Sequence, residues 1–203
     1  MDITAILTAF ITLIVVVDPV GLAPLFVALT QGATTRERRA IGLRACVTGA
    51  ALLTLFGVFG EAVLGFAGIS LPAFRIAGGI LLFLTALDML FERRTQRRRG
   101  QASHDSDPSI FPLATPLIGG PGAITTIILL TGEAGDDLTA NLEIYLVLFA
   151  VISLVFVFFL AAGFIERLLG DTGINVITRL LGMLLAALSV QFVIDGLQSV
   201  IAG

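Results

Sequence analysis

The stretch Asp18-Pro19-Val20-Gly21-Leu22-Ala23-Pro24 lies inside an apolar segment, and a second stretch of the same kind, Thr115-Pro116-Leu117-Ile118-Gly119-Gly120-Pro121-Gly122, follows later. In each stretch the two prolines are five residues apart, and the second pair follows the first at an offset of 97 residues (116 − 19 = 97 and 121 − 24 = 97). A proline inside a helix removes a backbone donor and clashes with the preceding turn. Lipid cannot satisfy the freed groups, so a broken membrane helix persists only where protein buries it or where it lines a polar cavity.

The composition predicts an integral membrane protein without a separate soluble domain. Mean hydropathy is +1.03, and the 203 residues are 57% hydrophobic and only 13% charged. A soluble domain of this length would need far more polar surface. The first apolar run is too long for a signal peptide and carries Asp2 but no basic residue before it, so we expect no cleaved signal.

Six apolar segments are close to or above the ~20 residues that a membrane-spanning helix needs. They run approximately Ile3–Leu29, Ala40–Phe66, Pro72–Phe91, Ile110–Thr131, Leu142–Leu168 and Ile174–Ile201. The sequence therefore predicts an all-α membrane protein with six transmembrane helices.

The loop charges predict the orientation. An alternating path puts one set of arginines on a single side: Arg36, Arg38, Arg39, Arg93, Arg94, Arg97, Arg98, Arg99 and Arg167. Because cytoplasmic loops are rich in basic residues, this side is predicted to be cytoplasmic, in the cell (inner) membrane, with both termini extracytoplasmic. We interpret the arginine runs as topology anchors beside anionic lipid, and expect no nucleic-acid partner.

The polar stretch after the third segment divides the chain into two halves. We expect residues 1–91 to form a first three-helix repeat, residues 92–109 a cytoplasmic linker and residues 110–203 a second three-helix repeat of one membrane domain. Three spans per half turn the second half upside down, which makes a 3+3 inverted-topology repeat with discontinuous helices 1 and 4. A second match supports this, because Arg75-Ile76-Ala77-Gly78 aligns with Arg179-Leu180-Leu181-Gly182 at an offset of 104.

Asp18 is the only carboxylate well inside an apolar segment. A charge at the bilayer centre costs ~2.5–3.5 kcal/mol on insertion scales, so such residues are functional candidates. Asp18 could attract a substrate ammonium, hold Na⁺ or titrate with a coupling proton. Alternatively it caps a helix, because Asp accepts hydrogen bonds at helix starts and Pro suits the first helical position. These roles are compatible.

The two helix breaks themselves predict a binding site. A helix that restarts at Pro19 or Pro121 directs N–H groups and a charge of ~+0.5 into the break, which suits a carboxylate. The carbonyls that end the preceding half-helix suit an ammonium or a cation, so a zwitterion matches two facing breaks. Glycines there should permit close approach and positive φ. The alternative is that the prolines merely kink packed helices. The predicted substrate-binding residues are Asp18, Pro19, Val20, Gly21, Thr115, Pro116, Gly119, Gly120, Pro121, Gly122 and Thr125.

Three further polar residues are predicted to have gating or structural roles: Arg75, Arg179 and Gln191. The two arginines could instead snorkel to the interface or cap carbonyls. No catalytic or metal-ligating constellation is evident, because the spans hold no His, no Ser/His pairing and no pair of facing aspartates. We therefore expect no enzymatic activity, no cofactor and no metal.

Four stretches, in this order, resemble a known family: Asp18-Pro19-Val20-Gly21; Gly68-Ile69-Ser70-Leu71-Pro72 followed by Arg75-Ile76-Ala77-Gly78-Gly79; Pro112-Leu113-Ala114-Thr115-Pro116 with Gly119-Gly120-Pro121-Gly122; and Arg179–Gly196. Together they resemble the MarC family of six-helix membrane proteins over nearly the whole chain. The resemblance implies the three-plus-three fold and, from the SnatA-type members, transport of glycine, alanine, serine or threonine. Many members of that family carry Asn at the position of Asp18.

The expected function is therefore secondary transport of small neutral amino acids, by an exporter or exchanger that binds them at the midplane between broken helices 1 and 4. H⁺ or Na⁺ is the expected coupling ion. Two alternatives stay open: a channel or pore for small solutes or ions, and a membrane protein without transport activity.

Overall fold

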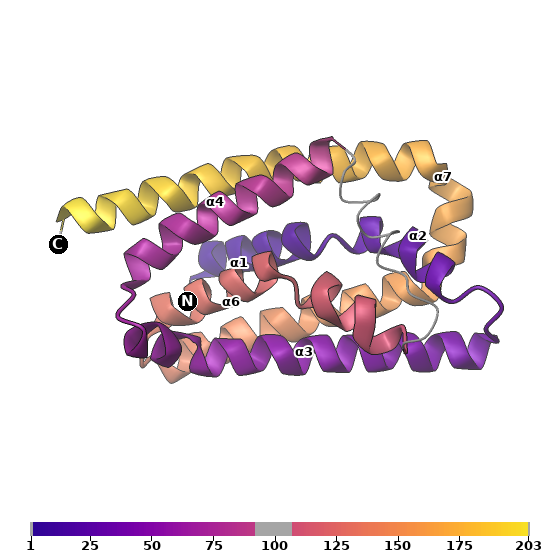
Figure 1. Ribbon diagram of the computed structural model, residues 1–203, viewed down its shortest axis with the longest axis horizontal. Coiled ribbons are helices and arrows are strands. Elements are labelled where there is room, and N and C mark those ends of the chain that lie inside the picture. Colours follow the sequence, from indigo (N-terminus) through magenta and orange to yellow (C-terminus); the bar gives the residue numbers. More distant parts are fainter. Residues whose placement is uncertain (1, 92–106, 203) are drawn as a thin grey trace.

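The computed structural model describes residues 2–91 and 107–202, and every regular element in this part of the chain is a helix. The elements are α1 (Ile3–Val17), α2 (Pro19–Leu29), α3 (Thr35–Phe66), α4 (Leu71–Leu90), η1 (Ser109–Ile118), α6 (Pro121–Ala134) and α7 (Leu138–Ala202). Figure 1 shows most of them lying along the long axis of the molecule. Most of the predicted linker, residues 92–106, lies outside the described residues.

The helices confirm the prediction of an all-α membrane protein. Four helical segments of the described chain are long and apolar enough to cross a membrane: Ile3–Leu29, Thr35–Phe66, Leu71–Leu90 and Leu138–Ile201. A fifth arises if η1 and α6, which are bent by 55° at a short break, count as one span.

The long helix α7 covers both of the last two segments that the sequence predicts. Its 65 residues would extend about 98 Å if straight, against a hydrocarbon core of ~30 Å. Gly170 breaks it with φ 59° and ψ 174°, a conformation open mainly to glycine. Figure 1 shows the ribbon of α7 turning back, so that an N-terminal and a C-terminal arm run along opposite sides of the molecule. Gly170 lies between the predicted segments Leu142–Leu168 and Ile174–Ile201, so the break falls where the sequence predicts it, with helix continuing on both sides up to this one glycine.

Local caps explain where α3 and α4 begin. The Thr34 hydroxyl accepts from the Glu37 N–H at 3.3 Å, and the Glu37 carboxylate accepts from the Thr34 N–H at 2.7 Å, which is a complete capping box. Helix α3 therefore begins at Thr35, ahead of the predicted Ala40. Ser70 caps α4 in the same way, through its hydroxyl and the N–H of Ala73 at 3.3 Å.

The C-terminal arm of α7 packs along α4, and this is the most extensive contact between two elements. Figure 1 shows the two helices side by side. A Cβ placed on Gly79 would lie 2.7 Å from the backbone oxygen of Ser189, and one on Gly196 would lie 3.0 Å from that of Pro72. Small residues of this kind let membrane helices approach closely, backbone against backbone.

The middle of the molecule is formed by the first two helices. Figure 1 shows α1 between α4 and α3. Val15, Val16 and Val17 at the end of α1 are at most 2% exposed, as is Leu22 in α2. The junction of α1 and α2 is therefore enclosed by protein on all sides.

Candidate functional site

The first helix break consists of one residue, Asp18. Its φ of 56° and ψ of 66° are left-handed, and it is 0% exposed. Its N–H donates to the Ile14 carbonyl at 2.9 Å and its carbonyl accepts from the Leu22 N–H at 3.0 Å, so it ends α1 and begins α2. One carboxylate oxygen, Oδ1, accepts from the Gly21 N–H at 3.0 Å. The structure thus contains the cap that the sequence predicts, with the carboxylate held in the protein interior.

The glycines of the two breaks serve close approach and not positive φ. Gly119 has φ −87° and Gly120 has φ −76°, and neither Gly21 nor Gly122 has a positive φ. The expectation of left-handed glycines is therefore wrong, because Asp18 takes that conformation at the first break and the second uses an extended residue. A Cβ on Gly21 would lie 2.2 Å from Asp18 Oδ2, so the glycine makes room for the carboxylate.

The second break lies between η1 and α6, where two cis peptide bonds, Phe111–Pro112 and Thr115–Pro116, precede it. Helix α6 restarts at Pro121 with Gly120 as its N-cap, and no side chain accepts a hydrogen bond from its first turn. The first N–H groups of this helix, those of Gly122 and Ala123, therefore have no capping side chain as acceptor. The two breaks therefore differ, since Asp18 occupies a donor of α2.

The two proline pairs are not equivalent in the structure. Pro19 and Pro121 each occupy the first position of a helix, at an offset of 102 residues (121 − 19 = 102), whereas Pro24 lies inside α2 and Pro116 precedes the break. The structurally equivalent prolines are therefore Pro19 and Pro121, and not the pairs at an offset of 97 residues. Their offset of 102 residues is close to the offset of 104 residues between Arg75 and Arg179. The physical reason is that proline suits a helix start, where its missing N–H costs nothing.

The two interrupted segments meet in the interior. A Cβ on Gly122 would lie 3.2 Å from a methyl of Val16 in the last turn of α1 and 3.0 Å from a methyl of Leu82 in α4. The first turn of α6 therefore packs beside the end of α1, two residues before Asp18. This brings the buried carboxylate and the uncapped helix start into one region.

A cavity of about 480 Å³ opens beside the second break. It is lined by Phe56, Gly60, Val63 and Leu64 of α3, Phe74 and Leu81 of α4, and Thr115, Pro116, Gly119, Pro121, Ile124, Thr125 and Ile128 around the break. Five predicted residues are in this set, and its two hydroxyl side chains are threonines among otherwise apolar walls. The predicted residues of the first break, Asp18, Pro19, Val20 and Gly21, do not line it.

The contribution of α3 to this region is absent from the sequence-based prediction. A Cβ on Gly49 would lie 2.5 Å from Ile118 Cγ2, and one on Gly60 would lie 2.5 Å from Ile128 Cγ1. Helix α3 therefore lies against both sides of the second break. The spacing of small residues along one face of α3 is the signal that would have indicated this packing.

The three predicted gating or structural residues occupy different environments. Arg75 donates to Glu133 at 2.5 Å and so links α4 to α6, with side chains 16% and 49% exposed. Arg179 is exposed on the C-terminal arm of α7. Gln191 is also exposed and donates to Asp195 at 2.7 Å, and neither residue lines the cavity. The matched sequence positions of the arginines therefore do not give matched surroundings.

The Arg75–Glu133 ion pair should stabilise the contact between α4 and α6. A double-mutant cycle with Arg75→Gln and Glu133→Gln should give a coupling free energy of about 1–2 kcal/mol, less than the ~3–5 kcal/mol of a fully buried pair because Glu133 is half-exposed. Unfolding in mixed micelles measures it. The matched control is Arg44–Asp107, which joins two exposed side chains at 3.0 Å and should couple by less than about 1 kcal/mol. Equal coupling in both cycles would contradict the assignment.

Comparison with known proteins gives a consistent result. The profile of a family described as "MarC family integral membrane protein" matches residues 3–201 of the chain. A UPF0056 membrane protein of Aquifex aeolicus is 38% identical over 200 residues, covering 95% of this chain and 92% of that protein. The UPF0056 membrane proteins YvbG of Bacillus subtilis and YhcE of Escherichia coli are 36% and 34% identical, with 94% and 92% of their lengths covered. No solved structure matches the chain.

Proposed function

The chain belongs to the MarC family of integral membrane proteins, and we propose that it is a secondary transporter, an exporter or exchanger, of small neutral amino acids such as glycine, alanine, serine or threonine. One observation carries the proposal. A buried carboxylate at one helix break, Asp18, lies in the same region as an uncapped helix start at a second break, Pro121. Interrupted helices that meet in this way are typical of secondary-transporter sites.

The proposed site binds the two charges of a zwitterion at the two breaks. The substrate carboxylate accepts from the N–H groups of Gly122 and Ala123, where the α6 dipole favours negative charge. The ammonium faces Asp18 and the carbonyls at the end of α1, and Asp18 is the group through which H⁺ or Na⁺ couples to transport. The solute leaves unchanged, so this role is transport and not catalysis.

The apolar cavity beside the second break supports a substrate with a small uncharged side chain. Its walls come from α3 and α4, and Thr115 and Thr125 are its hydroxyl groups. A substrate with a charged side chain would lose the hydration of that charge in the cavity and would find no charged partner there. Burying an unpaired ion in this way costs several kcal/mol. The same chemistry opposes a hydrated ion pore.

The proposed topology has six spans in a 3+3 inverted repeat. The spans are α1 with α2, α3, α4, η1 with α6, and the two arms of α7 on either side of Gly170. Helices 1 and 4 are the discontinuous ones. Both termini are then extracytoplasmic in the inner membrane, because the arginine-rich side faces the cytoplasm.

Reporter fusions test this topology. A reporter at Ala102, which lies outside the described residues, should be cytoplasmic, and one at the C-terminus should be extracytoplasmic. Alkaline phosphatase and green fluorescent protein give opposite signals in the two compartments. Both positions on the same side would contradict six spans and the inverted repeat.

Flux into proteoliposomes tests the function. With radiolabelled glycine or threonine, a carrier should give saturable uptake that unlabelled substrate inside the vesicles accelerates by counterflow. Flux that never saturates would identify a channel or pore. Absence of flux with all four amino acids would favour the third alternative, a membrane protein without transport activity.

A further inference from the structure

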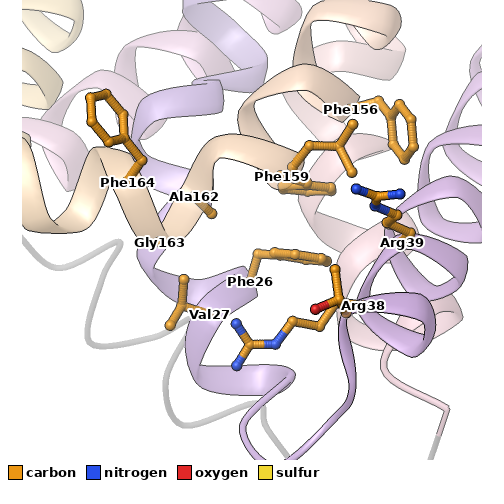
Figure 2. A pocket seen from close by; sticks show the side chains of 12 residues that line it. Phe26, Val27, Arg38, Arg39, Phe156, Phe159, Ala162, Gly163 and Phe164 are labelled. Carbon is orange, nitrogen blue, oxygen red and sulfur yellow. The ribbon is translucent and has the colours of Figure 1, made fainter.

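A cavity of about 220 Å³ lies between α2, α3 and α7, apart from the cavity beside the second break. Its charged groups do not converge on one point, because Figure 2 shows Arg38 and Arg39 on opposite sides of the stacked rings of Phe26 and Phe159. The cavity beside the second break differs, since no described residue that lines it is charged. The hydroxyl groups in its wall therefore decide which polar contacts a bound side chain can make.

Thr125 carries the one buried hydroxyl among the described residues of this wall. It is 5% exposed, whereas Thr115 is exposed. The next threonine of α6, Thr126, donates to the Gly122 carbonyl at 2.9 Å, which is the usual bond of a threonine inside a helix. The Thr125 hydroxyl makes no hydrogen bond to a described residue, and its oxygen keeps accessible surface at the cavity. This hydroxyl is therefore open to a ligand.

Gly78 of α4 determines how the side chain of Thr125 is turned. A Cβ on Gly78 would clash with Thr125 Cγ2 and would lie 3.7 Å from Thr125 Cβ, so the threonine methyl occupies the space that the glycine leaves. Because the methyl and the hydroxyl share one Cβ, a methyl held against α4 turns the hydroxyl away from Gly78. Thr125 follows Pro121 by four residues, ~6 Å of helix rise, and both line the cavity. The hydroxyl therefore lies about one turn beyond the start of α6.

We propose that Thr125 makes the site select amino acids whose side chain carries a hydroxyl, serine and threonine, over apolar amino acids of the same size. The inference rests on the proposed function, which binds the substrate carboxylate at the first turn of α6 and its side chain in the cavity. The Thr125 hydroxyl and the substrate hydroxyl can each donate and accept. An apolar side chain of equal size would exclude water and leave the Thr125 hydroxyl without a partner, so it binds more weakly.

The neighbouring residues supply matched variants. Thr125→Val removes the hydroxyl and keeps the shape of the side chain, whereas Thr125→Ser keeps the hydroxyl and removes the methyl. Thr126→Val is the control, since Thr126 is 0% exposed, is bonded within its own helix and does not line the cavity. Gly78→Ala displaces Thr125 but leaves its hydroxyl in the chain. Adding Thr125→Ser to Gly78→Ala removes the methyl with which the new Cβ clashes.

Competition in proteoliposomes tests the proposal, with radiolabelled glycine as the transported solute and unlabelled serine and L-2-aminobutyrate as competitors. 2-Aminobutyrate has a methyl group where serine has its hydroxyl, so the ratio of the two inhibition constants isolates the hydroxyl. The parent should bind serine more tightly. Thr125→Val should lower that preference about fivefold, which corresponds to the ~1 kcal/mol that one hydrogen bond contributes.

The other variants show whether the hydroxyl itself is responsible. Thr126→Val and Thr125→Ser should keep the preference of the parent for serine. Gly78→Ala should lower it, and Gly78→Ala combined with Thr125→Ser should restore it. Because the ratio compares two competitors on the same variant, a general loss of stability or expression cancels.

Three results would overturn the proposal. Equal inhibition of the parent by serine and 2-aminobutyrate, with saturable glycine transport, would refute the selectivity and leave the proposed function intact. Equal losses of preference in Thr125→Val and Thr126→Val would assign the effect to the packing of α6. Glycine flux that neither competitor nor unlabelled glycine reduces would refute the proposed function, and the role of Thr125 with it.

Discussion

Replacing Gly120 with valine should lower amino acid counterflow in proteoliposomes by at least about tenfold, the largest effect that we expect from a single substitution. A Cβ on Gly120 would lie 2.5 Å from the backbone oxygen of Pro116. Because backbone atoms cannot rotate away as a side chain does, the turn between η1 and α6 must open, at a cost of ~1–3 kcal/mol for overpacking. If this cost raises the activation free energy of transport by about 1.4 kcal/mol, the transport rate already falls tenfold.

A graded series separates this effect from general destabilisation. Gly119→Val should be milder, because the Cβ of that residue would meet Leu52 Cδ2, the mobile end of a side chain, at 2.5 Å. Gly65→Val is the control, since an ideal Cβ on Gly65 has no heavy atom within 4 Å. Expression and melting temperature are measured in parallel. Full transport in Gly120→Val at normal expression would mean that the Pro/Gly segments are only kinks.

The second large effect concerns the charge of Asp18. Asp18→Asn should keep the fold, because Asn caps a helix as well as Asp does and tolerates left-handed φ. It should shift the dependence of transport on pH or on Na⁺, because the buried carboxylate is the proposed contact for ammonium and coupling ion. Asp18→Ala should instead lose stability, by ~1–2 kcal/mol for the cap and a similar amount for the left-handed backbone.

Transport measured against pH and against Na⁺, in the parent and in Asp18→Asn, decides between the roles. Superimposable curves would leave Asp18 a structural residue that caps α2. A displaced curve with an unchanged melting temperature would support the ligand or coupling role.

Hydropathy was sufficient to locate most of the membrane helices. The first predicted segment, Ile3–Leu29, has the same bounds as the first candidate span, and α4 begins and ends within one residue of the prediction. Hydropathy did not predict the helix ends that backbone hydrogen bonds and glycine conformation determine. The capping box at Thr34 extends α3 by a polar turn, and in α7 the helix continues on both sides up to Gly170, which lies between the two segments predicted there.

The candidate site was only partly predictable. The repeated prolines predicted both breaks and also the residues at which the helices restart, Pro19 and Pro121. Their matched offset of 97 did not predict which positions are equivalent in the structure, because that depends on neighbouring backbone geometry. A glycine in a sequence can be needed either for a positive φ or for close approach of two groups, and the sequence does not show which. In this structure Gly21 and Gly120 allow close approach and have no positive φ. The role of α3 depends on contacts between distant segments, such as that of Gly49 with Ile118, which a single sequence does not contain.

The close seam between α4 and the C-terminal arm of α7 restricts how such a protein could move. Gly79 and Gly196 bring the two backbones together there, yet α4 belongs to the predicted repeat 1–91 and the arm to 110–203. If each repeat rocked as a rigid body, this seam would have to shear. A motion that preserved the seam would instead keep α4 and the arm together, and the chain would then have to bend elsewhere, for example at Gly170.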